Sequence, residues 1–511
     1  MNTNTPSPPS ERAGYRPSAR TALAPLPGAA LVLAYAPFGV WPLTVLGFAL
    51  LLWLWDDATP GRAALRGGLF GLGLYGAGIY WVYISLHHYG NAPPAFAALA
   101  TFLLILLMAA YPAAVGFLLV RLAPVPGPCR WLLLAPGLWL LLEWVRSWLF
   151  TGFPWLALGY SQIEGPLAGL APVTGMFGLS LAVALSGGCL YSLWRGDNRL
   201  RGLALVLLVL IWGGSWWLGQ QQWVHPAGEP IRVALVQGNI GQERKFDPEI
   251  LARTLADYVD LSVAETDSAD LVVWPETAIP TFHDTLDPAF FRRLEAHARA
   301  TATDFLAGVP SGDWRNKVYH NSVVSIGSYP GFYYKHRLLP FGEYLPLRSV
   351  LNFFHRFVDI PMADFTPGAA DQPLLRAGGY PVGISICFEA VFGSEIRRSL
   401  PEAAYLVNVS NDAWFGRSLA PYQHLEIARM RALEAGRPMA RATNTGVSAL
   451  VDHRGRILQQ SEWFVAAVVR GEIQPMQGVT PYVRLGNWPS LLLAAILAVA
   501  GGWPWPASRP R

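Results

Sequence analysis

Three residues of different chemical type stand where predicted buried strands meet loops. Glu276 closes the run LVVWPE, Lys335 lies in GFYYKHRLLPFGEYLP, and Cys387 ends the apolar run of VGISICFE. By type they are a proton acceptor, a cation and a nucleophile, and ligands of α/β sheets bind at the carboxyl ends of strands. Taken singly, each also has an ordinary interpretation, because free cysteines are usually small core residues and Glu and Lys usually lie at the surface.

The choice of lysine singles out Lys335 further. Of the 38 Lys and Arg residues only three are lysines, namely Lys245, Lys317 and Lys335, so 35 are arginines. An amine in a chain that otherwise uses guanidinium groups indicates a need for a compact point charge. The sequence assigns no role to Lys245 or Lys317.

The elements that position these residues fall into two parts of unlike composition. Of the 511 residues 52% are hydrophobic and only 14% are charged, whereas a soluble protein carries nearer 25% charged residues. The long apolar runs therefore predict a membrane protein. A single helix over residues 22–55 would be about 50 Å long, so the chain must turn at 39–42. We expect eight spans, at residues 21–38, 42–56, 67–86, 95–121, 131–149, 170–194, 202–218 and 488–506.

The loops between these spans predict their orientation. Arginines follow the second, fourth and sixth spans and flank both ends of the chain, whereas the connections at 39–41, 87–94 and 150–169 contain no Lys or Arg. Short cytoplasmic loops are rich in Lys and Arg. We therefore expect both termini, including a tail over residues 1–20, to be cytoplasmic, and the long segment after the seventh span to lie outside.

Residues 229–474 predict a folded α/β domain outside the membrane. Asp247-Pro248 and Asp287-Pro288 each supply an N-cap followed by Pro at the first helical position. The tethers to the seventh and eighth spans are short, so the domain must sit on the membrane surface. Ten runs are predicted strands, at residues 231–236, 270–274, 305–309, 318–326, 332–338, 382–387, 405–409, 439–443, 448–452 and 465–470.

In their sequence contexts, Glu276, Lys335 and Cys387 resemble the triad of the nitrilase superfamily. Those contexts are WPET, YYKHRLLPFGEY and ICFE. The membrane spans, with VQGNI at 236–240, GFPWL at 152–156 and NVSNDAWFG at 408–416, resemble one member family, the bacterial apolipoprotein N-acyltransferases, over about residues 20–506. The resemblance implies seven membrane helices over 21–218, a periplasmic αββα sandwich over 229–474 and an eighth helix over 488–506. The chain would thus lie in the bacterial inner membrane.

The resemblance also implies a reaction. Glu276 takes the thiol proton, Cys387 attacks a phospholipid ester, and Lys335 with the backbone N–H of Phe388 stabilises the oxyanion. The acyl group then passes from a thioester to the α-amino group of the diacylglyceryl-cysteine that begins an apolipoprotein. Phe388 stands where Tyr is also found in the family, a difference of little consequence if the backbone serves.

Two glutamates are supporting candidates, and four histidines are not. Glu343 and Glu389 follow the lysine by eight residues and the cysteine by two, and such glutamates support the triad in the family that the chain resembles. The alternative is that they are ordinary salt-bridging carboxylates. No distinctive motif surrounds the histidines, which we take as structural: His283, His320, His336 and His424.

A lipid substrate also needs an apolar route. Residues 341–366 are too apolar for an ordinary loop, and Trp414 and Phe415 add bulk in another. These surfaces suit a lid or a membrane interface, with internal packing as the alternative. The candidate residues in the first loop are Leu351, Phe353, Phe354 and Phe357. In the fifth span, Glu143 and Arg146 share a helical face as either a functional or a structural ion pair.

Other function classes stay open. A membrane-anchored nitrilase or amidase would use the same triad with water as acceptor, but it would need only one anchor. A transport or lipid-binding protein with an inert outer domain would form no covalent adduct at Cys387. The sequence predicts no cofactor, no metal site and no nucleic-acid partner, because Cys129, Cys189 and Cys387 are scattered and no Gly-rich phosphate loop is present.

Overall fold

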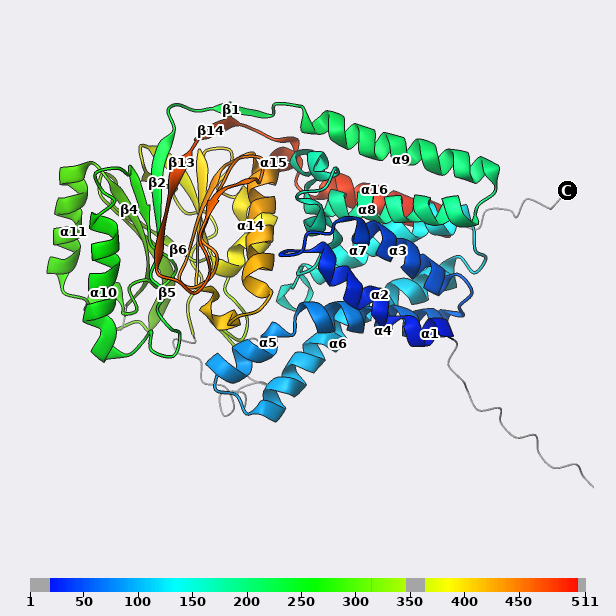
Figure 1. Cartoon of the computed structure of the whole chain (residues 1–511), viewed down its shortest axis with the longest axis horizontal. Helices are drawn as coiled ribbons and strands as arrows, with labels where there is room; N and C mark the ends of the chain where they lie inside the picture. The colour runs from blue at the N-terminus through cyan, green and yellow to red at the C-terminus, as the bar shows by residue number, and fades with distance from the viewer. Residues whose placement is uncertain (1–18, 314, 346–363, 504–511) are drawn as a thin grey trace, which may run out of the picture.

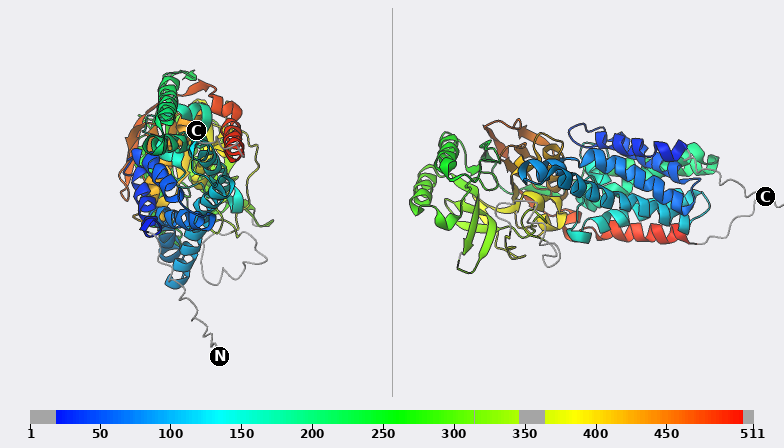
Figure 2. Two further views of the ribbon diagram at one scale, coloured as in Figure 1. Left: turned by 90° about the vertical axis from the view of Figure 1, so that its right-hand side faces the viewer. Right: turned by 90° about the horizontal axis from the view of Figure 1, so that it is seen from below.

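The computed structural model describes residues 19–313, 315–345 and 364–503. The apolar helices pack side by side, and an α/β domain sits at one end of them (Figure 1). A view from below shows the same two parts end to end, with the last helix, α16, returning to the helical part (Figure 2).

Helical segments lie over all eight predicted spans. They are α1 (Ala19–Leu23), α2 (Pro25–Ala30), η1 (Leu31–Ala34), α3 (Pro42–Trp55), α4 (Pro60–Gly78), α5 (Trp81–Ile84), η2 (Ser85–Tyr89), α6 (Pro94–Leu122), η3 (Cys129–Leu134), α7 (Ala135–Arg146), α8 (Ala171–Arg195), α9 (Asn198–Gly219) and α16 (Trp488–Gly502). Helix α4 begins seven residues before the predicted start of its span, because Pro60 at the first helical position opens the helix there.

Within the described residues, three helical segments are long and apolar enough to cross a membrane. They are Pro94–Leu122, Ala168–Arg195 and Asn198–Gly219, and the pair α4 with α5–η2, bent by 49°, would make a fourth. Three shorter apolar helices cover Ala19–Ala34, Pro42–Trp55 and Trp488–Gly502. The count of eight crossings stays a prediction.

Small residues allow α4 and α6 to approach closely. A Cβ atom on Gly67 would lie 2.3 Å from the carbonyl oxygen of Pro112, and one on Gly71 would lie 2.7 Å from the Cα atom of Ala109. Either substitution would push the two helices apart. Close backbone contact at small residues is typical of helix packing in membranes, where there is no hydrophobic drive between helices.

The α/β domain contains two six-stranded sheets. The first has the order β13-β2-β3-β4-β5-β6 and the second the order β12-β11-β10-β9-β8-β7. The strands of the first are β2 (Ile231–Gln237), β3 (Leu271–Val273), β4 (Asp304–Asp313), β5 (Val318–Ile326), β6 (Gly331–Tyr334) and β13 (Ala467–Ile473). Those of the second are β7 (Leu375–Ala377), β8 (Tyr380–Ile386), β9 (Tyr405–Ser410), β10 (Met439–Thr443), β11 (Ala449–Val451) and β12 (Ile457–Gln460).

Three apolar layers hold these sheets and their helices together. Buried residues of both sheets, such as Leu235 and Val407, form one shared core between them. Helices α10 (Pro248–Val263) and α11 (Pro288–Thr301) pack outside the first sheet, and α13 (Gly393–Arg397) and α14 (Ala420–Ala435) outside the second. The order is therefore helix, sheet, sheet, helix, which is the predicted αββα sandwich.

Two connections fix the domain to the helical part. The strands β1 (Val224–Pro226) and β14 (Met476–Gly478), which enter and leave the domain, pair with each other. Helix α14 is buried along its length, and its polar residues reach segments of the helical part. Glu426 accepts a hydrogen bond from the N–H of Ala36 at 3.0 Å, and Gln423 accepts one from the indole of Trp155 at 2.7 Å.

All ten predicted strands are present, and two of them end earlier than predicted, directly before Lys335 and Cys387. The strand predicted at 332–338 ends at Tyr334, because the side chain of Glu389 takes the N–H groups of His336 and Arg337 in place of a strand partner. The strand predicted to include Cys387 ends at Ile386. Four short strands were not predicted, namely β1, β7, β12 and β14.

Candidate active site

Glu276 lies three residues beyond β3 with both carboxylate oxygens engaged. Its Oε1 accepts a hydrogen bond from the side-chain amide of Asn321 at 2.7 Å, and its Oε2 accepts one from the backbone N–H of Asn411 at 2.9 Å. Asn321 belongs to β5 of the same sheet and Asn411 follows β9 of the other. The side chain is buried. The carboxylate is therefore held rigidly where the two sheets meet.

Lys335 follows β6 and is 1% exposed. Its Nζ atom lies 2.8 Å from the carboxylate of Glu343 and 3.6 Å from Oε1 of Glu276. Burial alone would lower the pKa of this amine, but the carboxylates of Glu343 and Glu276 outweigh burial and raise the pKa above its ordinary value. Lys335 is therefore a fixed ammonium group.

Cys387 begins a short helical turn, η9 (Cys387–Val391), directly after β8. Its φ angle is +50°, a left-handed conformation that is uncommon for any residue with a side chain. Burial raises the pKa of the thiol, the carboxylate of Glu276 raises it further, and the ammonium of Lys335 opposes both. The thiol is therefore protonated at neutral pH, and it needs a base before it can act as a nucleophile.

The structure thus brings the three predicted residues together. Glu276 and Lys335 come from the first sheet and Cys387 from the second, each just past the end of a strand. The thiol interacts electrostatically with both charged partners. A carboxylate, a thiol and an ammonium in one buried site can perform nucleophilic acyl chemistry with proton transfer and oxyanion stabilisation.

Glu389 holds the two turns that carry the nucleophile and the lysine. Its carboxylate accepts hydrogen bonds from the N–H of Ile386 at 2.8 Å, His336 at 2.7 Å and Arg337 at 3.0 Å, and from the hydroxyl of Tyr333 at 3.1 Å. Burial raises its pKa to about 7, against the opposing effect of Lys335 and these N–H groups. The carboxylate acts as a hub between the turn after β6 and the turn after β8.

Glu343 lies beside the lysine, as its spacing of eight residues allows. Beyond Lys335, it accepts hydrogen bonds from the amide of Asn321 at 2.8 Å and from the N–H of Leu339 at 2.7 Å. The same Asn321 amide therefore bridges the two carboxylates on either side of the ammonium. Both glutamates are buried, and Glu343 forms a salt bridge with Lys335, so the supporting role of the two residues stays a prediction.

Two further buried groups contact the backbone of the triad, and sequence reasoning missed both. Lys245 is 2% exposed, and its Nζ donates to the backbone carbonyl of Glu276 at 3.0 Å. His424, on α14, places Nε2 3.2 Å from the carbonyl oxygen of Cys387. The scarcity of lysine was a signal for Lys245, whereas no local motif marks His424.

A buried ion network stands behind His424. Its Nδ1 lies 3.0 Å from Oδ1 of Asp412, and Oδ2 of Asp412 accepts a hydrogen bond from Arg441 at 2.8 Å. Burial and the Arg441 charge lower the pKa of His424, although Asp412 opposes them. The pKa of Asp412 is held well below its ordinary value, because Arg441 and His424 outweigh burial. Of the four histidines taken as structural, His424 is the one that touches the backbone of the nucleophile.

Comparison with known proteins identifies relatives over most of the chain. The family model described as the N-terminal domain of apolipoprotein N-acyltransferase matches residues 27–189, and the carbon-nitrogen hydrolase model matches residues 232–481. The apolipoprotein N-acyltransferase of Methylococcus capsulatus is 47% identical over 92% of this chain and 93% of its own length. That of Nitrosomonas europaea is 44% identical over 93% of this chain and 95% of its own length.

The chain belongs to the apolipoprotein N-acyltransferase family. Its α/β domain has the carbon-nitrogen hydrolase fold, and its apolar helices are those of a bacterial membrane protein.

Of the candidate lid and substrate-binding residues, two lie within the described residues and four lie outside them. Trp414 and Phe415 lie in the turn η10 (Asp412–Phe415) and contact the helical part. The ring of Phe415 lies 4.8 Å from that of Trp81, and Ser85 donates to the carbonyl of Trp414 at 2.8 Å. Both side chains are half-buried, and the ring of Phe415 packs against the helical part, so their role in a lid or in substrate binding stays a prediction. The other candidates lie outside the described residues: Leu351, Phe353, Phe354 and Phe357.

Phe388 and the Glu143–Arg146 pair are also located. Phe388 is buried in η9 with its ring 5.1 Å from that of Phe392. The two members of the pair, both buried in α7, lie 4.0 Å apart. Arg146 donates to the carbonyl of Trp155 at 2.6 Å. That contact fixes the GFPWL segment, which includes Trp155, to α7.

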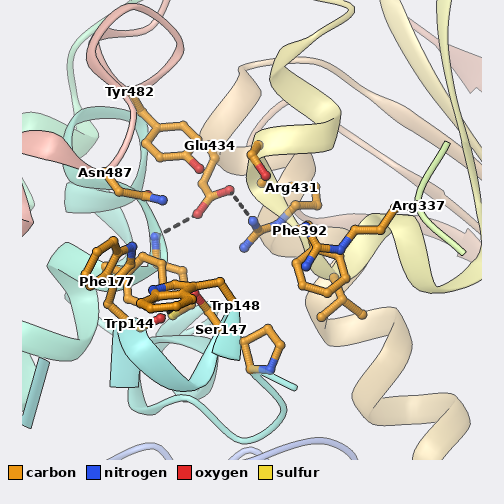
Figure 3. A pocket seen from close by; sticks show the side chains of 15 residues that line it. Trp144, Ser147, Trp148, Phe177, Arg337, Phe392, Arg431, Glu434, Tyr482 and Asn487 are labelled. Carbon is orange, nitrogen blue, oxygen red and sulfur yellow. Dashed lines mark hydrogen bonds and ion pairs between the residues drawn. The ribbon is translucent and has the colours of Figure 1, made fainter. Parts of the chain in front are cut away.

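A cavity of about 200 Å³ lies between the nucleophile turn and the helical part. Figure 3 shows Arg337 and Phe392 on the side of the α/β domain and the rings of Trp144 and Trp148 on the other. Across it, Glu434 pairs with Arg431 at 3.0 Å and accepts the N–H of Met176 at 2.7 Å. Glu434 thus links α14 to α8 through the hydrogen bond from Met176.

Proposed function

We propose that this chain transfers an acyl chain from a membrane phospholipid to the α-amino group of the diacylglyceryl-cysteine at the N-terminus of apolipoproteins, through a thioester on Cys387. N-acylation of apolipoproteins follows from membership of the family. The observation that supports the finer mechanism is a protonated thiol coupled to a fixed carboxylate and a fixed ammonium 3.6 Å apart.

The first half-reaction forms the thioester. Glu276 accepts the proton of the Cys387 thiol, and the thiolate adds to the ester carbonyl of the phospholipid. The ammonium of Lys335 and the N–H of Phe388 stabilise the oxyanion. The carbon–oxygen bond to the glycerol then breaks, and Glu276 returns the proton to the leaving oxygen, which releases a lysophospholipid.

The second half-reaction forms the amide. The α-amino group of an N-terminal residue has an ordinary pKa near 8, so at neutral pH it is mostly protonated and must lose a proton before it can attack. Glu276 serves as the base again. The nitrogen adds to the thioester carbonyl and the carbon–sulfur bond breaks. Of the two protons that the ammonium group loses, one ends on the Cys387 thiol and the other passes through Glu276 to solvent. The amide is more stable than the thioester, which drives transfer forward.

The reaction is tested by intact-protein mass spectrometry of the full-length chain after incubation with phospholipid alone. We expect a mass increase of one acyl group, confined to Cys387 and discharged when a diacylglyceryl peptide is added. Absence of any adduct would favour the lipid-binding alternative. Discharge by water at the same rate as by the peptide would favour the amidase alternative.

We further propose that the α/β domain is periplasmic and that both termini are cytoplasmic. The support is the distribution of arginine among the connections, which are basic on alternate sides only. A periplasmic site also has access to lipoproteins that have been exported. The domain boundaries at 21–218, 229–474 and 488–506 belong to the same proposal.

A further inference from the structure

A second cavity, of about 650 Å³, lies between the end of α9 and the α/β domain. One wall is formed by Ser215 and Trp216 of α9 with Trp223 just beyond it, and the other by the turn between β11 and β12, residues 452–456. Glu276, Lys335 and Cys387 do not line this cavity. It is large enough for the polar part of a lipid, since ligand pockets usually measure about 300–1,000 Å³.

The charge of the lining is positive. Three arginines, Arg429, Arg454 and Arg456, face one carboxylate, Glu164, which leaves a net charge of +2 with His453 neutral. Arg429 is already committed, because it pairs with Glu164 at 2.8 Å and donates to the carbonyl of Gly455 at 2.8 Å. Among residues 19–313, 315–345 and 364–503, no carboxylate lies within ion-pair distance of the guanidinium of Arg454 or Arg456.

The turn that carries these two arginines is tightly fixed. The carboxylate of Asp452 accepts the backbone N–H groups of Arg454 and Arg456, each at 2.8 Å, so it is occupied with the backbone of the turn. Gly455 between them has a φ of +75°, and a Cβ atom there would lie 2.9 Å from the carbonyl oxygen of Arg429. The turn therefore fixes the backbone positions from which the two arginine side chains extend into the cavity.

The cavity lies at the level of a membrane surface. Helix α9 is apolar enough to cross a bilayer, and only 11% of its most apolar window is buried inside the protein, so it faces lipid. Trp216 and Trp217 stand at its end and are exposed, and three glutamines, residues 220–222, follow. Tryptophan is enriched at the boundary between hydrocarbon and headgroups. The two arginines thus lie where phosphates of the bilayer lie.

We propose that this cavity binds the phosphate of a membrane phospholipid, separately from the acyl donor at Cys387. Arginine forks bind phosphate through paired hydrogen bonds, and Arg454 and Arg456 supply two such forks. The acyl chains would lie along the exposed apolar side of α9, which includes Val209 and Leu210. The bound lipid would thereby join α9 to the edge of the α/β domain.

The test is retention of lipid by the full-length chain, measured by native mass spectrometry from detergent. A Cys387→Ala background prevents acyl transfer from consuming the lipid, so the result does not depend on the proposed reaction. The probes are phosphatidylglycerol, diacylglycerol with the same chains, and inorganic phosphate. The test variant is Arg454→Gln with Arg456→Gln. The matched control is Arg292→Gln with Arg293→Gln, two exposed arginines on α11, which Figure 1 shows at the far end of the α/β domain.

We expect the background protein and the control to retain phosphatidylglycerol, and the test variant to retain it at least about tenfold less, because two charge-assisted contacts are lost. Diacylglycerol should be retained weakly by all three, and millimolar inorganic phosphate should not displace the lipid. Equal retention by the test variant would overturn the proposal. So would equal retention of diacylglycerol, which indicates apolar binding alone, or displacement by inorganic phosphate, which indicates a site for a soluble anion.

Discussion

The Nζ atom of Lys245 lies 3.0 Å from the backbone carbonyl oxygen of Glu276, and Nε2 of His424 lies 3.2 Å from that of Cys387. Each carbonyl adjoins a left-handed backbone conformation, since φ is +51° at Thr277 and +50° at Cys387. Such conformations cost free energy and persist only where the surroundings hold them. The base and the nucleophile are therefore each held through the backbone by a buried side chain distant in sequence.

Replacement of Lys245 should impair the base without removing it. In Lys245→Met the side chain is unbranched and only one atom shorter, but the Glu276 carbonyl loses a donor worth about 1.5–3 kcal/mol. We expect kcat for acyl transfer to fall by about ten- to a hundredfold with KM for phospholipid nearly unchanged. Lys317→Met, which removes the exposed lysine, is the control and should keep full activity. A change confined to KM would contradict a positioning role.

The pH dependence of folding stability should also reflect the burial of Lys245. Burial lowers the pKa of Lys245 to about 8, so between about pH 8 and its ordinary value near 10.4 the unfolded chain binds more protons than the folded protein. Stability that depends on this group therefore rises with pH across that window. We therefore compare the unfolding temperature of Lys245→Met with that of wild type at each pH. The difference should favour the variant more at pH 7 than at pH 10. A difference independent of pH would contradict the lowered pKa.

Glu276→Gln should separate thiol acidity from catalysis. The carboxylate of Glu276 raises the pKa of the Cys387 thiol, whereas the Lys335 ammonium lowers it. Neutral Gln removes only the first effect, so alkylation of Cys387 by a small reagent should reach its midpoint at lower pH than in wild type. Acyl transfer should nevertheless be lost, because the base and the proton donor are gone. An unchanged alkylation midpoint would mean that the two groups do not interact.

Lys335→Arg should fail despite keeping the charge. The ammonium occupies a fully buried position 2.8 Å from Glu343, where a wider planar guanidinium does not fit. We expect loss of at least about two orders of magnitude in kcat, as for removal of an oxyanion donor. Measurement of acyl-adduct formation at Cys387 shows whether the variant slows formation of the thioester or only its discharge. Activity within a fewfold of wild type would rule out a fixed point charge.

The nucleophile itself admits no substitute. We expect Cys387→Ala to abolish transfer and Cys387→Ser to trap an oxyester that turns over too slowly to support activity. Cys189 is buried in α8 and Cys129 lies at the start of η3, both in the helical part, so neither can replace it. Mass spectrometry of the variants after incubation with phospholipid checks this. Full activity of Cys387→Ala would exclude the thioester.

The triad could be predicted because each member follows an apolar run and lies in a recognisable sequence context. Buried strands of this kind form the sheets, and the ends of the strands define the edge where the triad lies. The contacts that hold the triad could not, since Lys245 is 31 residues from Glu276 and His424 is 37 from Cys387. Pairings of that kind depend on how the two sheets stack. The extra residue assigned to β8 and the four residues assigned past Tyr334 have a similar cause, because the Glu389 carboxylate takes the N–H groups of Ile386, His336 and Arg337, and the sequence does not show this contact.

The pairing of β2 with β13 sets the order in which the domain can be made. These strands are neighbours in the sheet although more than two hundred residues separate Gln237 from Ala467. Strand β2 therefore cannot gain its outer partner until nearly all of the intervening chain has been synthesised and, for an external domain, exported. Loop closure on this scale is slow. Until β13 is present, the backbone groups along this edge of β2 have no partner strand. Chains truncated before β13 should therefore be degraded or aggregate rather than fold in part.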